Sequence, residues 1–319
     1  MFVRQLMAAG LGLLSMVGLS LFDYRRLARI NDLLFVGAYL LTVATVLPLG
    51  IGDGRWLTLG PFSVQPTELL KFSLILYLAT TLARKRNQVR SFVEGVLPFV
   101  IVVALIGVIV LSQPDLGMVL ILGAVTLAML FFAGARTVHL VGIVASSAPL
   151  IVLAVHLAPY RLARFLSFLN PQAYSRSSGY QTIQSLIAVG AGGVFGRGLG
   201  ASRAKLFYLP QSHNDFIASI IAEESGFLGM LVVLGMLGFL VWRAFVIAER
   251  ASDRLGRLLA FGIGFAIGFQ ALVNMGVVVG LLPVTGLTLP FFSNGGSSLI
   301  VTLAMVGVLL NVSKQGVAR

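Results

Sequence analysis

The sequence predicts an all-α polytopic membrane protein. Hydrophobic residues make up 58% of its 319 positions, charged residues only 11%, and the mean hydropathy is +0.98. A soluble domain of this length needs far more polar surface. The apolar residues gather in stretches of about 20, which is the length of helix that crosses a hydrocarbon core of ~30 Å. The chain has no cysteine, so disulfides and thiol chemistry are excluded.

Nine apolar windows are candidates for spanning helices. In chain order they are residues 4–22, 33–51, 66–83, 93–112, 115–134, 138–157, 214–240, 258–279 and 297–312. The last window is short, and we expect it to depend on its neighbours. The sequence therefore predicts one integral membrane domain over residues 1–319, with a large extracytoplasmic loop, 158–212, before the seventh helix.

Basic residues between the windows predict the orientation of the chain. Fourteen of the 23 fall in alternate connections, which the positive-inside rule places in the cytoplasm. They are Arg25, Arg26, Arg29, Arg84, Lys85, Arg86, Arg90, Arg136, Arg243, Arg250, Arg254, Arg257, Lys314 and Arg319. This assignment puts the N-terminus outside, an unusual start without a signal sequence. We therefore expect a further spanning helix ahead of Met1, which would give ten.

The extracytoplasmic loop, residues 158–212, carries six basic residues and no acidic one; we call it the basic loop. Its cations are Arg161, Arg164, Arg176, Arg197, Arg203 and Lys205. They could attract anionic lipid headgroups. Alternatively, they form a binding surface for an anionic, phosphorylated ligand at the outer membrane face, which is the interpretation we favour.

The stretch GAGGVFGRGLG, residues 190–200, lies within the basic loop. It has the composition of a phosphate cradle, but no strand precedes it, which excludes a dinucleotide-binding fold. The favoured interpretation is that these glycines let the backbone pack tightly in a re-entrant or interfacial helix.

The stretch FYLPQSHNDFIASIIAEESG, residues 207–226, holds three of the chain's eleven acidic residues. Carboxylates in such apolar surroundings indicate a functional site. On one helix, Glu223 lies ~12 Å and ~80° from Asp215, and Glu224 faces the opposite side. A hydrolase pair needs ~5–9.5 Å, so we expect Asp215 to act alone, in the first turn of the helix after Pro210. Capping of that helix by Asp215 is the alternative.

Other polar positions inside the windows have two interpretations each. Glu68 and Lys71 share one helix face, where they either form an ion pair that orients helices or contact substrate. Asp115 lies at a tight connection between two windows, where a helix cap is the favoured interpretation. His139 and His156 are isolated and receive no role, and no His/Cys metal signature is present.

Four segments together resemble the SEDS family of cell-wall polymerases, which includes FtsW, RodA and SpoVE. They are GYQTIQSLIAVGAGGVFGRGLGASRAKLFYLPQSHNDFIASIIAEESGFLG (179–229), RWLTLGPFSVQPTELLKF (55–72), QPDLG (113–117) and GLLPVTGLTLPFFSNGGSSLI (280–300). Together they span nearly the whole chain and occur in the family's order. The forms YLP-x-SHNDFI and GLTLPF are most similar to the FtsW division branch. Asn294, Gln211 and Ala218 depart from the family's usual Tyr, Glu and Phe.

The resemblance implies a peptidoglycan glycosyltransferase that polymerises lipid II into glycan strands at the outer face of the bacterial cytoplasmic membrane, for septal wall synthesis in cell division. It implies inverting transfer, with Asp215 as general base and undecaprenyl pyrophosphate as a leaving group that needs cations. The candidate substrate-binding residues are Arg55, Glu68, Lys71, Gln113, Asp115, Arg164, Gln181, Gln184, Arg203, Lys205, His213 and Ser297.

The resemblance also implies partners: a class B penicillin-binding protein, which is a transpeptidase, and other division proteins, but no nucleic acid. No cofactor is required by the sequence, although a divalent cation, Mg²⁺ or Mn²⁺, could bridge the pyrophosphate. The alternative function is a lipid II flippase, which would suit the polar residues Gln270 and Asn274 and broken helices. No window carries the chain of ionisable residues expected of a coupled carrier. A scaffold role would leave Asp215 unexplained.

Overall fold

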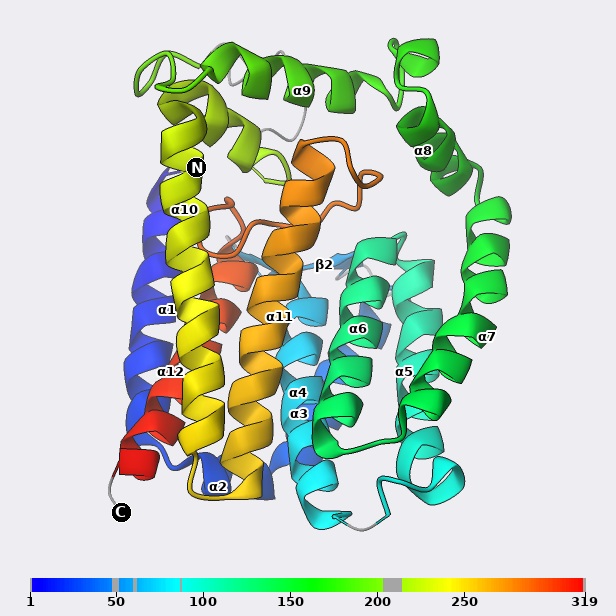
Figure 1. Ribbon diagram of the computed structural model, residues 1–319, viewed down its shortest axis with the longest axis vertical. Coiled ribbons are helices and arrows are strands. Elements are labelled where there is room, and N and C mark those ends of the chain that lie inside the picture. The colour runs from blue at the N-terminus through cyan, green and yellow to red at the C-terminus, as the bar shows by residue number, and fades with distance from the viewer. Residues whose placement is uncertain (1, 48–51, 60–61, 87, 203–213, 318–319) are drawn as a thin grey trace. The chain divides into compact units, whose positions relative to one another are not determined.

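The structure is a computed structural model that describes residues 2–47, 52–59, 62–86, 88–202 and 214–317 (Figure 1). Two compact units share the chain, and each is discontinuous in sequence. Unit 1 comprises Met1–Leu140, Leu240–Gly268 and Gly295–Arg319; unit 2 comprises Val141–Phe239 and Phe269–Asn294. The single domain over residues 1–319 stays a prediction.

Unit 1 is built from helices that follow the apolar windows. They are α1 (Phe2–Leu21), α2 (Tyr24–Arg29), α3 (Asn31–Ala44), α4 (Pro66–Arg84), the π-helix η1 (Phe92–Val96), α5 (Leu97–Ser112), α6 (Leu116–Ala133) and α12 (Gly296–Val317). Proline begins α4, where its missing N–H costs nothing. A left-handed glycine, Gly134 at φ 100°, ends α6, and its N–H donates to the Leu130 and Phe131 carbonyls.

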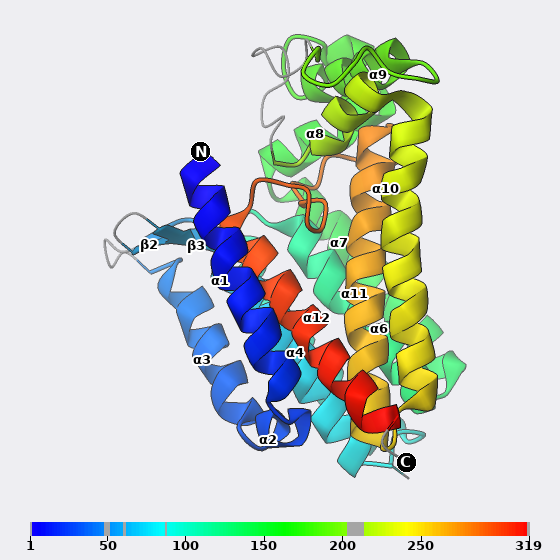
Figure 2. The ribbon, with the colours of Figure 1, turned by 90° about the vertical axis from the view of Figure 1, so that its left-hand side faces the viewer.

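Helix α4 forms the core of unit 1. It contacts α3, α6 and α12, and most of its side chains are buried, including Leu70, Leu74 and Leu78 along one face. Helix α1 packs along α12 (Figure 2). A Cβ atom on Gly307 would lie 2.4 Å from the Met16 carbonyl oxygen, so this small residue lets the two backbones approach closely.

A small antiparallel sheet precedes α4, where the sequence was expected to form a loop. Its strands β1 (Gly52–Asp53), β2 (Trp56–Leu59) and β3 (Phe62–Val64) pair in that order. Gly52 and Val64 both face Leu57 in the register of the sheet. The turn between β1 and β2 uses Gly54 at φ 61° and places Arg55 at its tip.

Unit 2 contains much of the basic loop, which is folded into helices rather than irregular. Its elements are the main part of α7 (Thr137–His156), α8 (Pro159–Leu169), the 3₁₀ turn η2 (Gln172–Tyr174), α9 (Tyr180–Gly192), and parts of α10 (Ile217–Arg250) and α11 (Arg254–Val278). Their apolar core includes Phe216, Val233 and Leu289. The buried Ser185 hydroxyl of α9 lies 2.7 Å from both the Ser219 hydroxyl and the Val278 carbonyl.

Helix α10 breaks at Gly226, which adopts φ 67° and ψ −166°. The glycine-rich segment, residues 190–200, supplies backbone partners on both sides of the break. Arg197 and Gly198 donate their N–H groups to the Glu223 and Glu224 carbonyls at 3.0 Å each, and Phe227 donates to the Gly193 carbonyl at 2.9 Å. The hydrogen bonds that the break removes from the helix are therefore replaced by this segment.

The glycines of this segment are required by close backbone approach. A Cβ atom on Gly192 would lie 1.9 Å from the Ala222 carbonyl oxygen, and one on Gly196 would lie 2.2 Å from that of Glu224. The interpretation of tight packing is confirmed. The N–H groups of Arg197 and Gly198 are used within the protein, so they are not available to cradle a phosphate.

The all-α polytopic membrane fold is confirmed, with the small sheet as an addition. Seven helices in the described part of the chain are long and apolar enough to cross a membrane: Phe2–Leu21, Phe92–Ser112, Leu116–Ala133, Thr137–His156, Ile217–Arg250, Arg254–Val278 and Gly296–Gly316. The windows 33–51 and 66–83 correspond to the 14-residue α3 and to α4, which carries a buried ion pair. Nine spanning helices therefore stay a prediction.

We expect Gly226→Ala to destabilise the protein. Its backbone conformation is essentially restricted to glycine and costs other residues about 1–3 kcal/mol, and the new Cβ atom would lie 2.3 Å from the Gly196 nitrogen. The measurement is the melting temperature in detergent. Gly235→Ala is the matched control on the same helix, because a Cβ atom there meets nothing within 4 Å. Equal melting temperatures for the two variants would contradict the role of the break.

Candidate functional site

Asp215 lies in the turn 214–216 that precedes α10. The helix begins at Ile217, so the prediction that Asp215 occupies its first turn is wrong. The reason is local: the Ser219 N–H donates to the Phe216 carbonyl at 3.0 Å, and the Asp215 carbonyl accepts instead from a side chain. Asp215 is half-buried, whereas Phe216 beside it is fully buried.

Two buried side chains hold this turn. Asn274 of α11 donates through Nδ2 to the Asp215 carbonyl at 2.8 Å and to the Leu287 carbonyl at 2.7 Å. Ser293 donates to the Asn214 carbonyl at 2.6 Å and accepts from the Leu289 N–H at 2.7 Å. The turn and the segment 279–294 are thus joined by the same two residues. Because both are buried, the main chain of the turn at Asp215 is fixed by hydrogen bonds that are shielded from water.

Gln270 lies one helical turn before Asn274 and also forms hydrogen bonds with the segment 279–294. Its amide donates to the Thr288 carbonyl at 2.9 Å and to the Thr288 hydroxyl at 3.1 Å. The two polar residues that suggested a transport path therefore anchor residues 287–288. Sequence reasoning missed Ser293, although a serine inside an apolar run was the available signal.

Glu223 and Glu224 hold the segment that follows the glycines. The Ser202 hydroxyl donates to Glu223 Oε2 at 2.6 Å, and Arg197 Nη1 lies 3.4 Å from Glu223 Oε1. The Ser202 N–H donates to Glu224 Oε1 at 3.4 Å. One cation of the basic loop, Arg197, is therefore neutralised within the protein. These contacts give both glutamates a structural role.

A second polar cluster lies in unit 1, around the connection between α5 and α6. Arg55 donates through Nε to the Gln113 carbonyl at 2.8 Å and through Nη2 to the Pro114 carbonyl. Its Nη1 lies 3.8 Å from Asp115 Oδ2. Asp115 Oδ1 accepts from the Met118 N–H at 3.1 Å, which confirms the predicted helix cap.

Gln65, which the sequence did not single out, links this cluster to α12. Its side chain donates to Asp115 Oδ2 at 3.3 Å, and its N–H donates to the Ser297 hydroxyl at 3.0 Å. Gln113 is fully buried and donates to the Thr42 carbonyl at 3.0 Å. Its Oε1 has no hydrogen-bond partner among the described residues. The structure thus brings together four predicted residues, Arg55, Gln113, Asp115 and Ser297; that they bind substrate stays a prediction.

Glu68 and Lys71 form an ion pair of 2.7 Å on α4, with side-chain exposures of 3% and 1%. The predicted pairing is confirmed. Two charges this deep in an apolar core are tolerated because each neutralises the other.

The remaining predicted residues lie on other elements of unit 2 or outside the described residues. Arg164 of α8 is half-buried, with its guanidinium 6.0 Å from the Tyr160 ring centroid. Gln181 and Gln184 lie three residues apart on α9 and are half-buried. Arg203, Lys205 and His213 lie outside the described residues. Within the described part of the chain, no three His, Asp or Glu side chains converge as metal ligands, so these residues alone do not fit a resident Mg²⁺ or Mn²⁺.

Fold and site define a polytopic membrane protein with a half-buried aspartate, held by its main chain, before a broken helix. Comparison with known proteins identifies the family. The FtsW/RodA/SpoVE family, described as "Cell cycle protein", matches residues 1–317. The chain therefore belongs to this family, the SEDS proteins.

Its relatives are similar over nearly the full chain. It is 44% identical to "Probable peptidoglycan glycosyltransferase FtsW" of Trichlorobacter lovleyi, over 97% of this chain and 82% of the relative. It is also 44% identical to "Stage V sporulation protein E" of Bacillus subtilis, over 98% and 86%. These similarities confirm the resemblance to the FtsW branch and its sporulation relative.

Two solved structures share the fold. One chain, from "Structural coordination of polymerization and crosslinking by a peptidoglycan synthase complex", has a TM-score of 0.79 and 33% identity, over 99% of this chain and 90% of that one. The rod shape determining protein RodA of Thermus thermophilus has a TM-score of 0.67 and 32% identity, over 98% and 87%.

We expect Lys71→Met to destabilise the protein by about 3–5 kcal/mol, because it leaves Glu68 charged and buried without its partner. The double variant Glu68→Leu/Lys71→Met should recover most of this loss, since two apolar side chains replace the pair. Melting temperatures in detergent measure both effects. A double variant as unstable as Lys71→Met would show that the carboxylate is not the source of the loss.

Proposed function

We propose that this chain is a peptidoglycan glycosyltransferase that polymerises lipid II into glycan strands for septal wall synthesis in cell division. Relatives that are 44% identical over almost the whole chain carry the name of this activity. The chain is an enzyme of the SEDS family and a multi-pass membrane protein. Its fold is shared by a chain from a peptidoglycan synthase complex.

In the proposed reaction, Asp215 is the general base. A sugar hydroxyl of one substrate attacks the anomeric carbon of the other, and its proton passes to the Asp215 carboxylate. The bond between that carbon and the pyrophosphate oxygen breaks, so the configuration inverts and undecaprenyl pyrophosphate leaves. A base must be within reach of substrate and held in place. The observation that carries the assignment is the half-buried Asp215, whose main chain is fixed by Asn274 and Ser293.

The leaving pyrophosphate needs positive charge rather than a proton donor. We propose that the basic loop supplies it, with Arg164, Arg203 and Lys205 as candidates. Arg197 is a weaker candidate because it is paired with Glu223. We propose no step through a divalent cation.

The proposed setting is the division septum of the bacterial cytoplasmic membrane. The partner we propose is a class B penicillin-binding protein, which would supply the cross-linking. Support comes from the shared fold with a chain from a synthase complex whose description names polymerization and crosslinking.

A lipid II flippase is the alternative function. An assay of the purified protein with lipid II distinguishes the two functions. Labelled lipid II in detergent offers no second compartment, so polymerisation can proceed there and transport cannot. Glycan strands longer than a single disaccharide unit, resolved by electrophoresis, are the expected product. Absence of any polymer from well-folded protein with its transpeptidase partner present would count against the proposal.

We expect Asp215→Asn to lose polymerisation by ~10²–10⁴-fold, the typical contribution of a general base, while the nearly isosteric side chain keeps the fold. The rate of glycan formation from labelled lipid II measures this effect. Asp32→Asn, which changes an exposed carboxylate of α3, is the matched control and should keep the wild-type rate. Normal polymerisation by Asp215→Asn would remove Asp215 from the mechanism.

We expect Asn274→Ala to lower kcat about 10-fold to 100-fold with a smaller change in KM, because a base displaced by about 1 Å loses that much. Asn311→Ala is the matched control: Asn311 is also buried and bridges two segments, accepting from the Tyr24 N–H and donating to the Ser20 carbonyl. Equal losses of activity for the two variants, measured below their melting temperatures, would assign Asn274 a purely structural role.

A further inference from the structure

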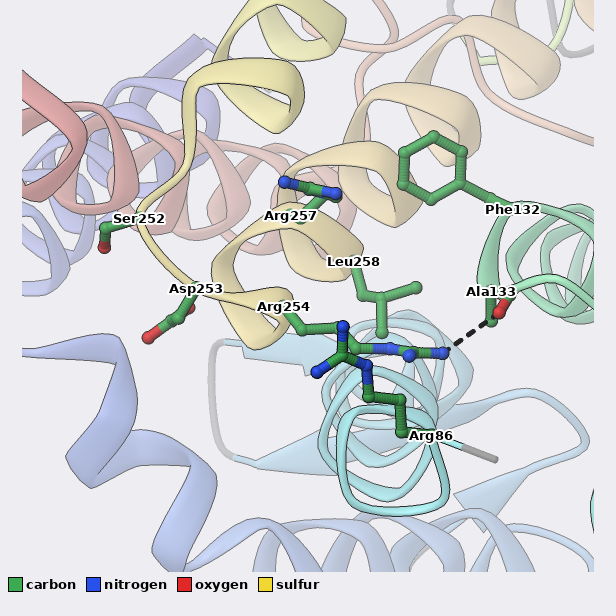
Figure 3. A pocket seen from close by; sticks show the side chains of 8 residues that line it. All are labelled: Arg86, Phe132, Ala133, Ser252, Asp253, Arg254, Arg257 and Leu258. Atoms are coloured by element: carbon green, nitrogen blue, oxygen red, sulfur yellow. Dashed lines mark hydrogen bonds between the residues drawn. The ribbon is translucent and has the colours of Figure 1, made fainter. Parts of the chain in front are cut away.

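A pocket of about 400 Å³ lies at one end of unit 1 (Figure 3). Three segments line it: Arg86 after α4, Phe132 and Ala133 at the end of α6, and the turn before α11 together with Arg254 and Arg257 in the first turn of α11. Figure 3 shows these side chains, with Arg254 bound to the Ala133 carbonyl at 3.0 Å.

The pocket has an excess of positive charge. Its carboxylate, Asp253, is already used: it lies 2.7 Å from Arg25 Nε and accepts from the Gly256 N–H at 2.7 Å. None of the ion pairs among the described residues includes Arg86, Arg254 or Arg257. Arg86, Arg254 and Arg257 all line this pocket, so three like charges gather in one place.

Such an arrangement favours an anion. Like charges at close range destabilise one another until an anion neutralises them. The planar guanidinium matches the oxygens of a phosphate group and can bind two at once. Arg254 is also the first residue of the 25-residue helix α11, whose N-terminal end carries partial positive charge.

The location narrows the class of ligand. The pocket lies among the connections that carry the basic residues, which the positive-inside rule assigns to the cytoplasm. Phe132 is 38% exposed, and its ring stacks on that of Phe261 with the centroids 4.0 Å apart. The pocket therefore has apolar surface next to its arginines. Basic pockets at the cytoplasmic ends of spanning helices suit anionic lipid headgroups. A soluble phosphorylated compound would present the same chemistry.

We propose that this pocket binds a phosphate group at the cytoplasmic face of the membrane. The bound group is held by Arg86, Arg254 and Arg257 and is supplied by an anionic phospholipid or by a soluble phosphorylated compound. This site is separate from the proposed polymerase chemistry at Asp215, so either can fail without the other.

The test measures binding to the purified full chain in detergent. One arm titrates short-chain phosphatidylglycerol against phosphatidylcholine, which carries no net charge; the other titrates inorganic pyrophosphate. Native mass spectrometry and the shift in melting temperature report binding. The variants are Arg257→Gln and Arg86→Gln, because both arginines are exposed and neither belongs to an ion pair among the described residues. Arg29→Gln, an exposed arginine at the end of α2, is the matched control.

Each single variant is expected to weaken binding about fivefold, and the double variant about 25-fold, because one arginine near a phosphate contributes on the order of a fivefold preference. If the arginine variants lose binding of phosphatidylglycerol but not of pyrophosphate, the phosphate group comes from a lipid. If they lose binding of pyrophosphate but not of phosphatidylglycerol, it comes from a soluble compound. Equal binding of phosphatidylglycerol and phosphatidylcholine without pyrophosphate binding, or an equal loss in Arg29→Gln, would overturn the proposal.

Discussion

A backbone that leaves its helix inside an apolar protein must find new hydrogen bonds, and this constraint organises unit 2. Lipid and packed side chains offer no water to replace a lost partner. The break at Gly226 is possible because residues 193–198 run beside it and exchange backbone hydrogen bonds with both sides. The turn at Asp215 is possible because the side chains of Asn274 and Ser293 donate hydrogen bonds to the carbonyls of Asp215 and Asn214. The position of Asp215 at the site therefore depends on buried groups that take no part in the proposed reaction.

Charges inside the protein follow a related rule, because each buried one is compensated by a specific neighbour. Glu68 is paired with Lys71 on α4, and Glu223 with Arg197 and Ser202. Asp115 combines a helix cap with contacts to other segments. Asp215 differs from these buried groups because it is half-buried.

The sequence predicted the helices well because hydrophobic length is a local property. The windows 93–112 and 115–134 coincide with helices to within a few residues. It also predicted the Glu68–Lys71 pair and the Asp115 cap, since both depend on spacing of three residues. The break at Gly226 could not be predicted from spacing, because its partners lie about 30 residues upstream. The role of Asn274, which would also suit the alternative transport function, could not be predicted for the same reason: its partner, the Asp215 carbonyl, is 59 residues away. Long-range hydrogen bonds have no local pattern in the sequence.

The packing of α1 on α12 joins two helices that are far apart in the sequence, and this has a consequence for biosynthesis. A ribosome adds ~5–20 residues per second, so the roughly 275 residues between the two helices take on the order of 15–60 s to make. Throughout that time the face of α1 around Gly12 cannot make its contact with Leu303. Unit 1 is therefore complete only after α12 has been made, and until then this face of α1 is covered by lipid, insertion machinery or other protein segments.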